Sequence, residues 1–106
     1  MSAVAGAVVY EVNLDVESGI ASEYRAWLQA HVADMLALPG FVSAELLEVI
    51  EPVADGRAAF CVHYRLRDAA ALEAYLHEHS ARMRAEGVAR FGDRFRAGRR
   101  VLRPGL

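Results

Sequence analysis

Hydrophobic and polar residues alternate in the first part of the chain, and this alternation predicts a β-strand over residues 8–16. Every second residue of that stretch is valine, tyrosine or leucine, whereas the residues between them include two acidic side chains and an asparagine. A period of two in β-branched and aromatic residues is typical of a strand that buries one face. Residues 41–50, 58–67 and 96–102 predict three more strands. The proline and the Asp-Gly pair within residues 51–57 mark a hairpin loop.

Two other stretches carry apolar residues at intervals of three and four, which is the spacing of one helix face. The first helix is expected to begin after Ser18, a residue type that caps helices, and to end where Pro39 and Gly40 interrupt the pattern. The second is expected to begin after Asp68 as its cap and to break or bend at Gly87, with a further helical turn closed by Gly92. The order βαββαβ predicts a ferredoxin-like α+β fold. Four antiparallel strands would form the sheet, and two helices would cover one of its faces.

Length and composition fit one domain without a metal site. The chain has 106 residues, so we expect a single ferredoxin-like domain over residues 1–106, with its core between about residues 8 and 102. Cys61 is the only cysteine, which excludes an internal disulfide and any multi-cysteine metal site. No HExxH pattern or acidic metal cluster occurs, so we expect no metal. Lysine is absent, which excludes chemistry such as Schiff-base formation.

No segment of the sequence is typical of a membrane span or of an export signal. The apolar runs are shorter than the roughly 18 residues that a membrane helix needs. The first residues are small and apolar but lack the basic region with which a secretory signal begins. We therefore expect no membrane association and a cytoplasmic location.

Charge is divided unequally along the chain. Residues 1–56 contain nine acidic residues and one arginine, whereas residues 82–106 contain eight arginines and two acidic residues. The net charge is −2, and the basic end has no interleaved exposed aromatic residues, so we expect no nucleic-acid binding. Charge pairing within the fold explains the pattern better, because a ferredoxin-like sheet places the first strand between the third and the fourth.

The expected strand order gives the acidic residues of the first strand basic neighbours on both sides. Glu11 and Asp15 would lie beside Arg65 and Arg67 of the third strand and, on the other side, beside Arg96 or its neighbours on the last strand. The sheet face away from the helices mixes apolar with charged residues, so it is too apolar to leave in water and too charged for a core. We therefore expect a homodimer through this open sheet face.

Five linked motifs resemble those of one known family. They are YEVNLDV, W-L-x-x-H-V-x-x-M-L-x-L-P-G-F, VHYRLRD, LEAYL and GVARFGDRF followed by RRVL, and the resemblance extends from about Val8 to Leu102. The chain is similar to a bacterial family of small domains of unknown function within the dimeric α+β barrel superfamily. This resemblance implies a ferredoxin-like protomer and a homodimer whose two sheets close a barrel. The family has no assigned activity, so the resemblance leaves open whether the protein is an enzyme.

The same resemblance bears on pockets and cofactors. The superfamily includes cofactor-free monooxygenases of antibiotic biosynthesis, and its members commonly keep a pocket between sheet and helices. A resemblance to the haem-degrading members would imply an Asn–Trp–His set, with one residue each on the first strand, the third strand and the second helix. Asn13 and His79 fit the first and last places, but the only tryptophan, Trp27, is in the first expected helix. We therefore expect no haem and no other cofactor.

The candidate functional residues lie in the expected layer between sheet and helices. Trp27 and His31 are four residues apart, so both project from one helix face towards the sheet. Tyr64 and Tyr75 are expected to face the same layer, and His79 follows Tyr75 by one helical turn. These five residues would line an aromatic cavity with a few polar groups, the usual composition of a small-molecule site. A desolvated His31 is the candidate catalytic group for proton transfer.

Two interpretations of the layer remain open. In the first, the homodimer binds a small aromatic or polyketide-like molecule in the pocket and could act as a cofactor-independent enzyme. In the second, the core is fully packed around His31, and the protein is a non-catalytic dimeric structural or protein-interaction module. A polar set on the open sheet face is interpreted as a salt-bridge layer at the dimer interface; its members are Glu11, Asn13, His63 and Arg65.

Overall fold

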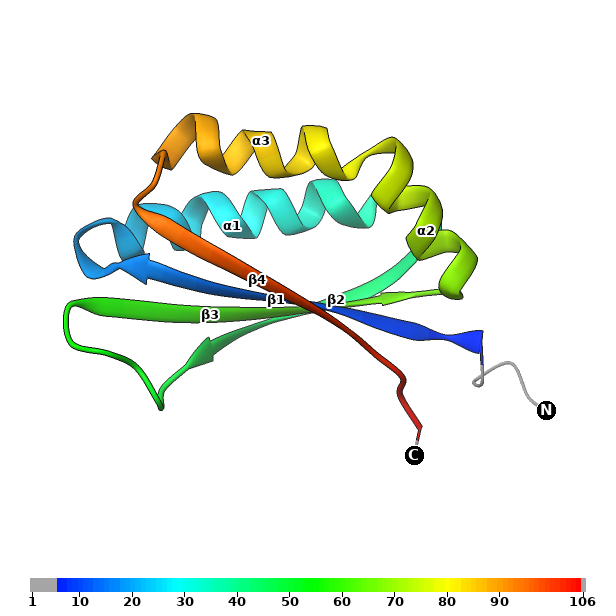
Figure 1. The fold of residues 1–106 in the computed structure, drawn as a ribbon, viewed down its shortest axis with the longest axis horizontal. Coiled ribbons are helices and arrows are strands. Elements are labelled where there is room, and N and C mark those ends of the chain that lie inside the picture. Colours follow the sequence, from blue (N-terminus) through cyan, green and yellow to red (C-terminus); the bar gives the residue numbers. More distant parts are fainter. Residues whose placement is uncertain (1–5, 106) are drawn as a thin grey trace.

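A four-stranded antiparallel sheet carries helices on one of its faces (Figure 1) in the computed structural model, which describes residues 6–105. The strands are β1 (Val8–Glu17), β2 (Phe41–Val49), β3 (Arg57–Leu66) and β4 (Phe95–Leu102). Their spatial order is β2-β3-β1-β4, so β1 and β3 are central and β2 and β4 form the edges. This order confirms the ferredoxin-like α+β fold and the central place of the first strand.

Residues 6–105 contain three α-helices, where two were expected. They are α1 (Ala21–Leu36), α2 (Ala69–Glu78) and α3 (Ser80–Phe91), and a short 3₁₀ turn, η2 (Ser18–Ile20), precedes α1. Figure 1 shows α1 and α3 lying over the same face of the sheet, with α2 turned away from the line of α3. The sheet-covering layer is therefore α1 on one side and α3 on the other.

The break in the second helix lies at His79 and not at Gly87, so that expectation was wrong. The Ser80 hydroxyl donates a 2.7 Å hydrogen bond to the Leu76 carbonyl oxygen, the acceptor that the Ser80 amide would use in a continuous helix. Such a side-chain bond competes with the backbone ladder and bends helices. Gly87 instead lies inside α3, and its lack of a side chain has a packing reason described below.

The ends of the helices confirm some sequence signals and correct another. Asp68 caps α2 as expected, because its carboxylate accepts a 2.8 Å hydrogen bond from the Ala71 amide. Ser18 does not cap α1, which begins at Ala21 without a side-chain cap; Ser18 starts the 3₁₀ turn instead. Gly40, with φ of 85°, adopts the left-handed conformation that the end of the first helix required.

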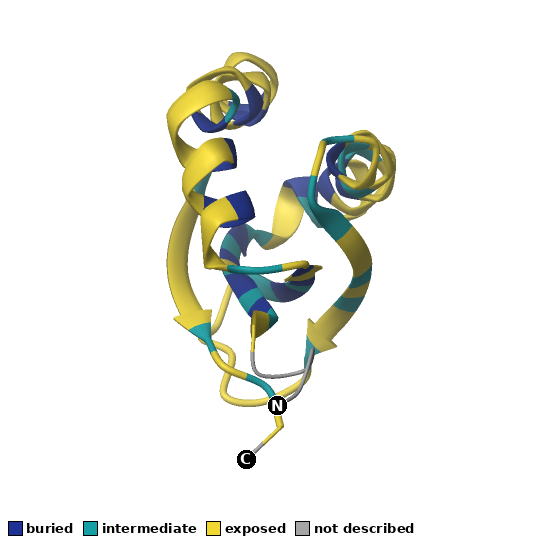
Figure 2. Ribbon diagram, turned by 90° about the vertical axis from the view of Figure 1, so that its right-hand side faces the viewer, coloured by how far each residue is buried: buried dark blue, intermediate teal, exposed yellow. Residues whose placement is uncertain are grey.

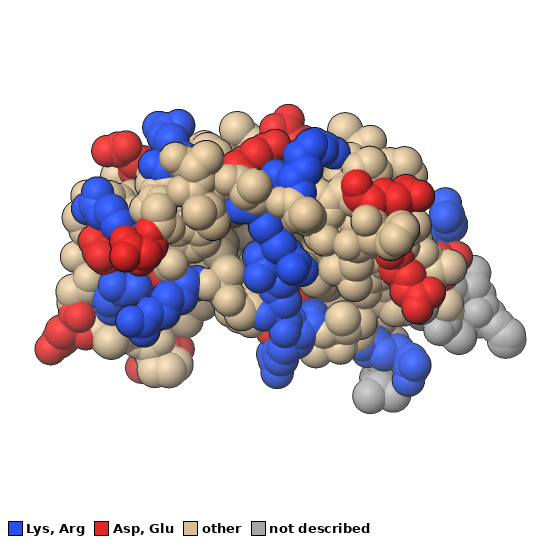
Figure 3. Space-filling model, turned by 45° about the horizontal axis from the view of Figure 1, so that its top comes forward, with Lys and Arg blue, Asp and Glu red and all other residues tan. Residues whose placement is uncertain are grey.

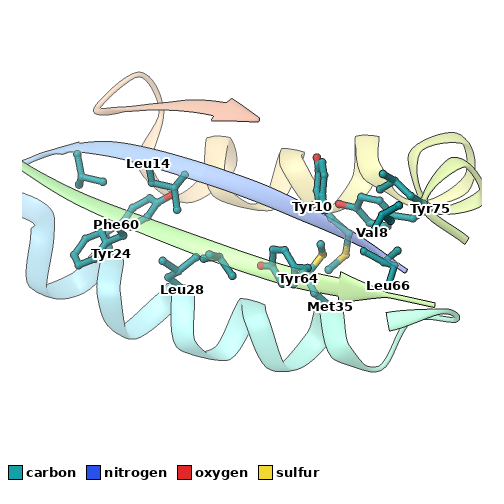
Figure 4. Packing of buried hydrophobic residues seen from close by; sticks show 14 of the residues in the cluster. Val8, Tyr10, Leu14, Tyr24, Leu28, Met35, Phe60, Tyr64, Leu66 and Tyr75 are labelled. Carbon is teal, nitrogen blue, oxygen red and sulfur yellow. The ribbon is translucent and has the colours of Figure 1, made fainter. Parts of the chain in front are cut away.

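The hydrophobic core lies between the central strands and the helices (Figure 4). It draws on every second residue of β1 and β3 and on one face of α1, as the two periodicities predicted. Figure 2 shows buried residues concentrated on the central strands and on the inner sides of the helices, with the edge strands largely exposed. Its largest fully buried side chains are Tyr24, Tyr64, Met35, Leu66, Val16 and Val62.

Cross-strand charge pairing is present. Glu11 pairs at 2.6 Å with Arg100, a neighbour of Arg96 on the last strand as expected, but the partners expected on the third strand were wrong. In the antiparallel register of β1 and β3, Glu11 lies opposite His63 and Asp15 opposite Ala59, so neither carboxylate faces Arg65 or Arg67 directly. Asp15 does lie beside Arg96 of β4, as expected, yet its ion pair is with Arg57, at 2.8 Å. The expectation for the third strand failed because the start of one antiparallel strand lies opposite the end of the other. Val8 therefore faces Leu66, and Glu17 faces Arg57.

Candidate functional site

A small cavity lies between the sheet and the helices α1 and α3. Its volume is about 50 Å³, enough for about three or four water molecules. Figure 3, which looks onto the helical side, shows the surface hollowed near its centre beside basic side chains. Seven of its lining residues carry rings: Tyr10, Tyr24, Trp27, His31, Tyr64, Tyr75 and Phe95.

Four of the five expected site residues line this cavity. Trp27 and His31 come from adjacent turns of α1, Tyr64 from β3 and Tyr75 from α2. The Trp27 and His31 rings are stacked, with centroids 4.6 Å apart and planes 19° from parallel. The spacing of four residues on α1 therefore places both rings on one wall.

His79 lies apart from the cavity. It occupies the junction of α2 and α3, where its Nδ1 is 3.0 Å from Nη2 of Arg82 and its Nε2 is 3.9 Å from Glu78. It is not among the lining residues, because the helix break at this position turns α2 away from the line of α3.

The His31 imidazole has an unusual electrostatic setting. Its Nδ1 is buried and makes no hydrogen bond within residues 6–105; the nearest acidic group is Glu86 of α3, whose Oε1 is 3.4 Å away. Burial lowers the pKa of His31 below its ordinary value, and the Glu86 carboxylate opposes this shift less strongly. The side chain is only 12% exposed, so His31 is held as a neutral imidazole near neutral pH.

The tyrosines keep the cavity polar without adding charge. Burial raises the pKa of Tyr64 and of Tyr75, that of Tyr75 to about 12, so both phenols remain protonated. Tyr10 and Tyr75 lie with ring centroids 5.8 Å apart (Figure 4). The Tyr10 hydroxyl accepts a 2.9 Å hydrogen bond from Nη2 of Arg84. The cavity thus combines aromatic walls with hydroxyl groups, an imidazole and a guanidinium.

Sequence reasoning missed several lining residues, and two signals would have found them. Met83 and Gly87, which line the cavity, are buried with Phe91 at intervals of four on α3, a pattern that the expected break or bend at Gly87 obscured. That continuous helix brings Arg84 to the cavity and Glu86 to His31. In β4, alternation with β1 places Phe95, Ala97 and Arg99 on the helical side of the sheet.

Gly87 lets α3 approach α1 at the cavity. A Cβ at this position would lie 3.1 Å from Cη2 of Trp27 and 3.3 Å from Cζ of Phe95, tighter than ordinary contacts. Any side chain here would therefore push Trp27 towards the cavity or away from α3. Gly87 and Trp27 together set the spacing between the two helices.

The opposite face of the sheet carries a separate polar network centred on Glu11. Its carboxylate accepts hydrogen bonds from Arg100 at 2.6 Å and Asn13 at 2.8 Å, and its other oxygen lies 2.8 Å from Nε2 of His63. Bonds from Arg100 and then Asn13 lower the pKa of Glu11 to about 2. Arg100 takes the place that was expected for Arg65 in this set.

Cys61 adjoins the Glu11 network. Its thiol, the Glu11 carboxylate and the His63 ring lie within 4.8 Å of one another, a grouping that metal ions also use. However, both Glu11 oxygens are already engaged, and burial raises the pKa of the Cys61 thiol. The geometry is that of a satisfied structural network.

Solved structures of the same fold come from several organisms. Cofactor-independent oxygenase SnoaB from Streptomyces nogalater matches with a TM-score of 0.71 and 17% identity, over 96% of both chains. A protein from Caulobacter crescentus CB15, described as a candidate antibiotic biosynthesis monooxygenase, matches with a TM-score of 0.71 and 19% identity. The match covers 97% of this chain and 93% of the other. A conserved protein from Methanosarcina mazei Go1 matches with a TM-score of 0.72 and 10% identity, over 96% of both chains. At these identities the likeness shows the fold.

Sequence comparison gives one further match. Residues 7–104 match the pattern of a family described as a domain of unknown function, DUF4286. Among curated proteins, none matches the sequence significantly. Within residues 6–105, no helix has both the length and the apolar character to cross a membrane.

Proposed function

Because the chain belongs to the DUF4286 family, whose description assigns no activity, we propose a function from the cavity: the protein binds a small aromatic molecule between α1, α3 and the sheet. The observation that carries this proposal is the stacked Trp27–His31 pair on the cavity wall. A tryptophan face offers a flat apolar surface, and the adjacent imidazole offers a polar group at its edge. Aromatic walls with a few convergent polar groups are typical of small-molecule sites.

The proposed role of His31 is proton transfer to or from the bound molecule. A neutral imidazole can accept a proton, and its lowered pKa follows from burial. With Nδ1 beside Glu86, Nε2 is the nitrogen left for the ligand. Glu86 would stabilise the imidazolium that forms, because an opposite charge at 3.4 Å favours the protonated state. Glu86 is in this scheme a positioning residue.

The size of the cavity requires that it widen on binding. Pockets for drug-sized ligands measure about 300–1,000 Å³, whereas this cavity measures about 50 Å³. Trp27 is well placed to move, because it is only partly buried and touches α3 at Gly87, which has no side chain. We propose that Trp27 rotates off Gly87 and admits a ligand of one or two fused rings.

The proposed activity needs no cofactor. SnoaB, which shares the fold, is described as a cofactor-independent oxygenase, and this supports a cofactor-independent reaction at the corresponding layer. The support is by analogy of fold, which hosts more than one function. Proton transfer by His31 is therefore the only step assigned to this chain.

We also propose that the protein forms a homodimer through its open sheet face. Leu47 is 37% exposed there, next to Cys61 in the register of β2 and β3. Pairing two such faces would bury these apolar groups and enclose the Glu11 network. Gel filtration with light scattering tests this, and a monomer at micromolar concentration would contradict it. Leu47→Asp should shift the dimer towards monomer.

The intrinsic fluorescence of Trp27 tests the binding proposal directly, because it is the only tryptophan in the chain. Titration with a panel of one- and two-ring aromatic compounds should change its emission with saturable curves. His31→Gln should alter the affinity or abolish proton exchange, whereas His77→Gln, which changes an exposed residue of α2, should not. If no compound alters the emission or the melting temperature, the binding proposal is wrong.

A non-catalytic dimeric module is the second candidate, and the small volume of the cavity favours it. In that case Trp27 and His31 would be core residues, and His31→Gln would lower the melting temperature without changing any ligand response. The fluorescence titration therefore separates the two candidates.

A further inference from the structure

The charged groups that line the cavity all carry the same sign. They are Arg84 of α3 and Arg99 of β4, and no acidic residue is among the described residues of the lining. Glu86 lies close by, but its carboxylate is next to His31 and it does not line the cavity. The cavity therefore has a positive mouth over an aromatic interior.

Neither arginine is neutralised by a carboxylate within residues 6–105. Six other arginines do have a carboxylate within 4.0 Å; Arg57, for example, has Asp15, and Arg100 has Glu11. Arg84 instead donates one hydrogen bond to the uncharged Tyr10 hydroxyl, at 2.9 Å. This bond fixes the guanidinium at the cavity and leaves its remaining N–H groups available.

Arg99 is placed at the cavity by the register of the sheet. It lies opposite Val12 of β1, on the helical side, two residues from Ala97, which also lines the cavity. Most residues on this side of the sheet are apolar, so an arginine here faces a core layer with its charged group at the exposed edge.

We propose that the ligand of this cavity is an organic anion, an aromatic ring bearing a carboxylate or an ionised enol or phenol oxygen, bound by Arg84 and Arg99. The inference rests on the proposed function and adds the charge of its ligand. A guanidinium forms paired N–H···O bonds with a planar anionic group, which a neutral ligand cannot match. A cationic ligand would be repelled by both arginines.

The position of the arginines complements the proposed role of His31. The aromatic ring of the ligand would lie against Trp27, with its anionic oxygen at the mouth and its acidic proton near the imidazole. If the ligand loses a proton to His31, the negative charge that develops stays close to two guanidinium groups. Such pre-placed positive charge stabilises a developing anion.

Isothermal calorimetry with matched ligand pairs tests the inference. The carboxylate pair is 2-naphthoate and 2-naphthamide, and the phenol pair is 4-nitrophenol, at a pH where it is ionised, and 4-nitroanisole. The wild-type protein should bind one or both anions about tenfold more tightly than the neutral partner. That preference should weaken as salt is raised. A preference for the anion in the naphthoate pair would indicate a carboxylate ligand, and one in the nitrophenol pair would indicate an ionised enol or phenol.

Variants then assign the preference to the two arginines. Arg84→Gln and Arg99→Gln should each reduce the affinity for the anion about three- to tenfold and leave that for the neutral partner unchanged. Arg84→Lys, which keeps the charge, should restore part of the loss. Arg96→Gln, an exposed arginine on the other face of the sheet, should bind like the wild type. Melting temperatures of all variants show whether each one is folded.

The outcomes separate this inference from the proposed function. Equal affinity for both members of each pair would leave aromatic binding intact and overturn the inference that the ligand is an anion. Unchanged anion binding by both glutamine variants would overturn the role of the arginines. If no member of either pair bound, the inference would fall together with the aromatic site.

Discussion

The indole of Trp27 stacks on the imidazole of His31 with ring centroids 4.6 Å apart. Trp27 also meets Phe91 edge-on, at 5.8 Å, and lies against Gly87 of α3. One side of the imidazole is thus covered by an aromatic ring, while its Nδ1 is buried beside Glu86. This arrangement removes water from His31 and explains why burial is the largest influence on its pKa.

The stability contributed by His31 should depend on pH. Its folded pKa lies below the ordinary value of 6.5, so below that pH the unfolded state binds the proton more readily than the folded state. Acidification through 6.5 should therefore destabilise the wild-type protein relative to His31→Gln. We expect the melting temperature of the wild type minus that of the variant to fall as pH is lowered from 8 to about 5.

His77→Gln is the control for that measurement, since it removes an exposed imidazole and leaves His31 in place. Its pH profile should keep the decline attributed to His31. A wild-type advantage that grows on acidification would mean that pairing with Glu86 outweighs burial, which contradicts the assigned direction. Glu86→Gln should lower the pKa of His31 further, measured by NMR titration of the imidazole, whereas Glu73→Gln, on the exposed side of α2, should not change it.

Gly87→Ala should alter the cavity more than the stability. Alanine favours a helix by about 1 kcal/mol over glycine, but its Cβ would lie 3.1 Å from Cη2 of Trp27. Because Trp27 borders a cavity, we expect it to shift, so that the two effects nearly cancel to within about 1 kcal/mol. The emission of Trp27 should change and ligand binding should weaken.

Gly98→Ala provides the matched comparison, because a Cβ at Gly98 would have no neighbour within 4 Å among residues 6–105. Its Trp27 emission should equal that of the wild type. A Gly87→Ala protein with unchanged emission and unchanged binding would show that the contact between Gly87 and Trp27 does not control the cavity.

The fold could be predicted from the sequence because its signals are local and periodic. Alternation in β1 and the Asp68 cap of α2 each depend on a few neighbouring residues, and both are found as expected. Trp27 and His31 were assigned to one wall because a spacing of four on a helix fixes their common face. Such inferences need no knowledge of distant contacts.

The parts that could not be predicted depend on tertiary contacts. Glycine is unfavourable inside helices, yet Gly87 lies within α3, and the Trp27 ring packs against it where a side chain would otherwise be. Ser80, an ordinary helix residue in the sequence, bends the chain through its bond to Leu76. The pairing of Glu11 with Arg100 depends on the strand register. Alternation cannot fix that register, because a shift of two residues keeps every side chain on the same face of the sheet.

Gly40→Ala should be strongly destabilising for two separable reasons. Gly40 has φ of 85°, where a side chain costs about 1 kcal/mol. Its added Cβ would also lie 2.5 Å from the Cβ of Ala71, a methyl group on α2 that cannot rotate away. We expect the clash to add about 1–3 kcal/mol, measured as the free energy of unfolding in urea.

Gly56→Ala isolates the backbone contribution. Gly56 has φ of 76°, but a Cβ there would meet no atom of the described part of the chain within 4 Å. Gly56→Ala should therefore cost only the backbone strain, and Gly40→Ala should cost more. Ala71→Gly in the Gly40→Ala background should recover part of the difference. Equal costs for the two glycine substitutions would refute the clash.

The Glu11–Arg100 ion pair should govern how the protein responds to acid. Glu11 has a folded pKa of about 2 against an ordinary value of 4.5, so its contribution to stability is complete above pH 4.5 and is lost as pH falls towards 2. Arg100→Gln removes the largest cause of the lowered pKa. The variant should be less stable than the wild type above pH 4.5, and the two should converge near pH 2.

Arg96→Gln is the matched control, because Arg96 shares the open sheet face and the strand of Arg100 but lies opposite Asp15, which is paired with Arg57. Its acid-unfolding curve should follow that of the wild type. Each curve is recorded at two protein concentrations, since dissociation of a dimer would make its midpoint depend on concentration. A constant difference between Arg100→Gln and the wild type from pH 7 to pH 2 would show that Glu11 does not titrate with the assigned low pKa. The loss would then come from packing of the Arg100 side chain and not from its charge.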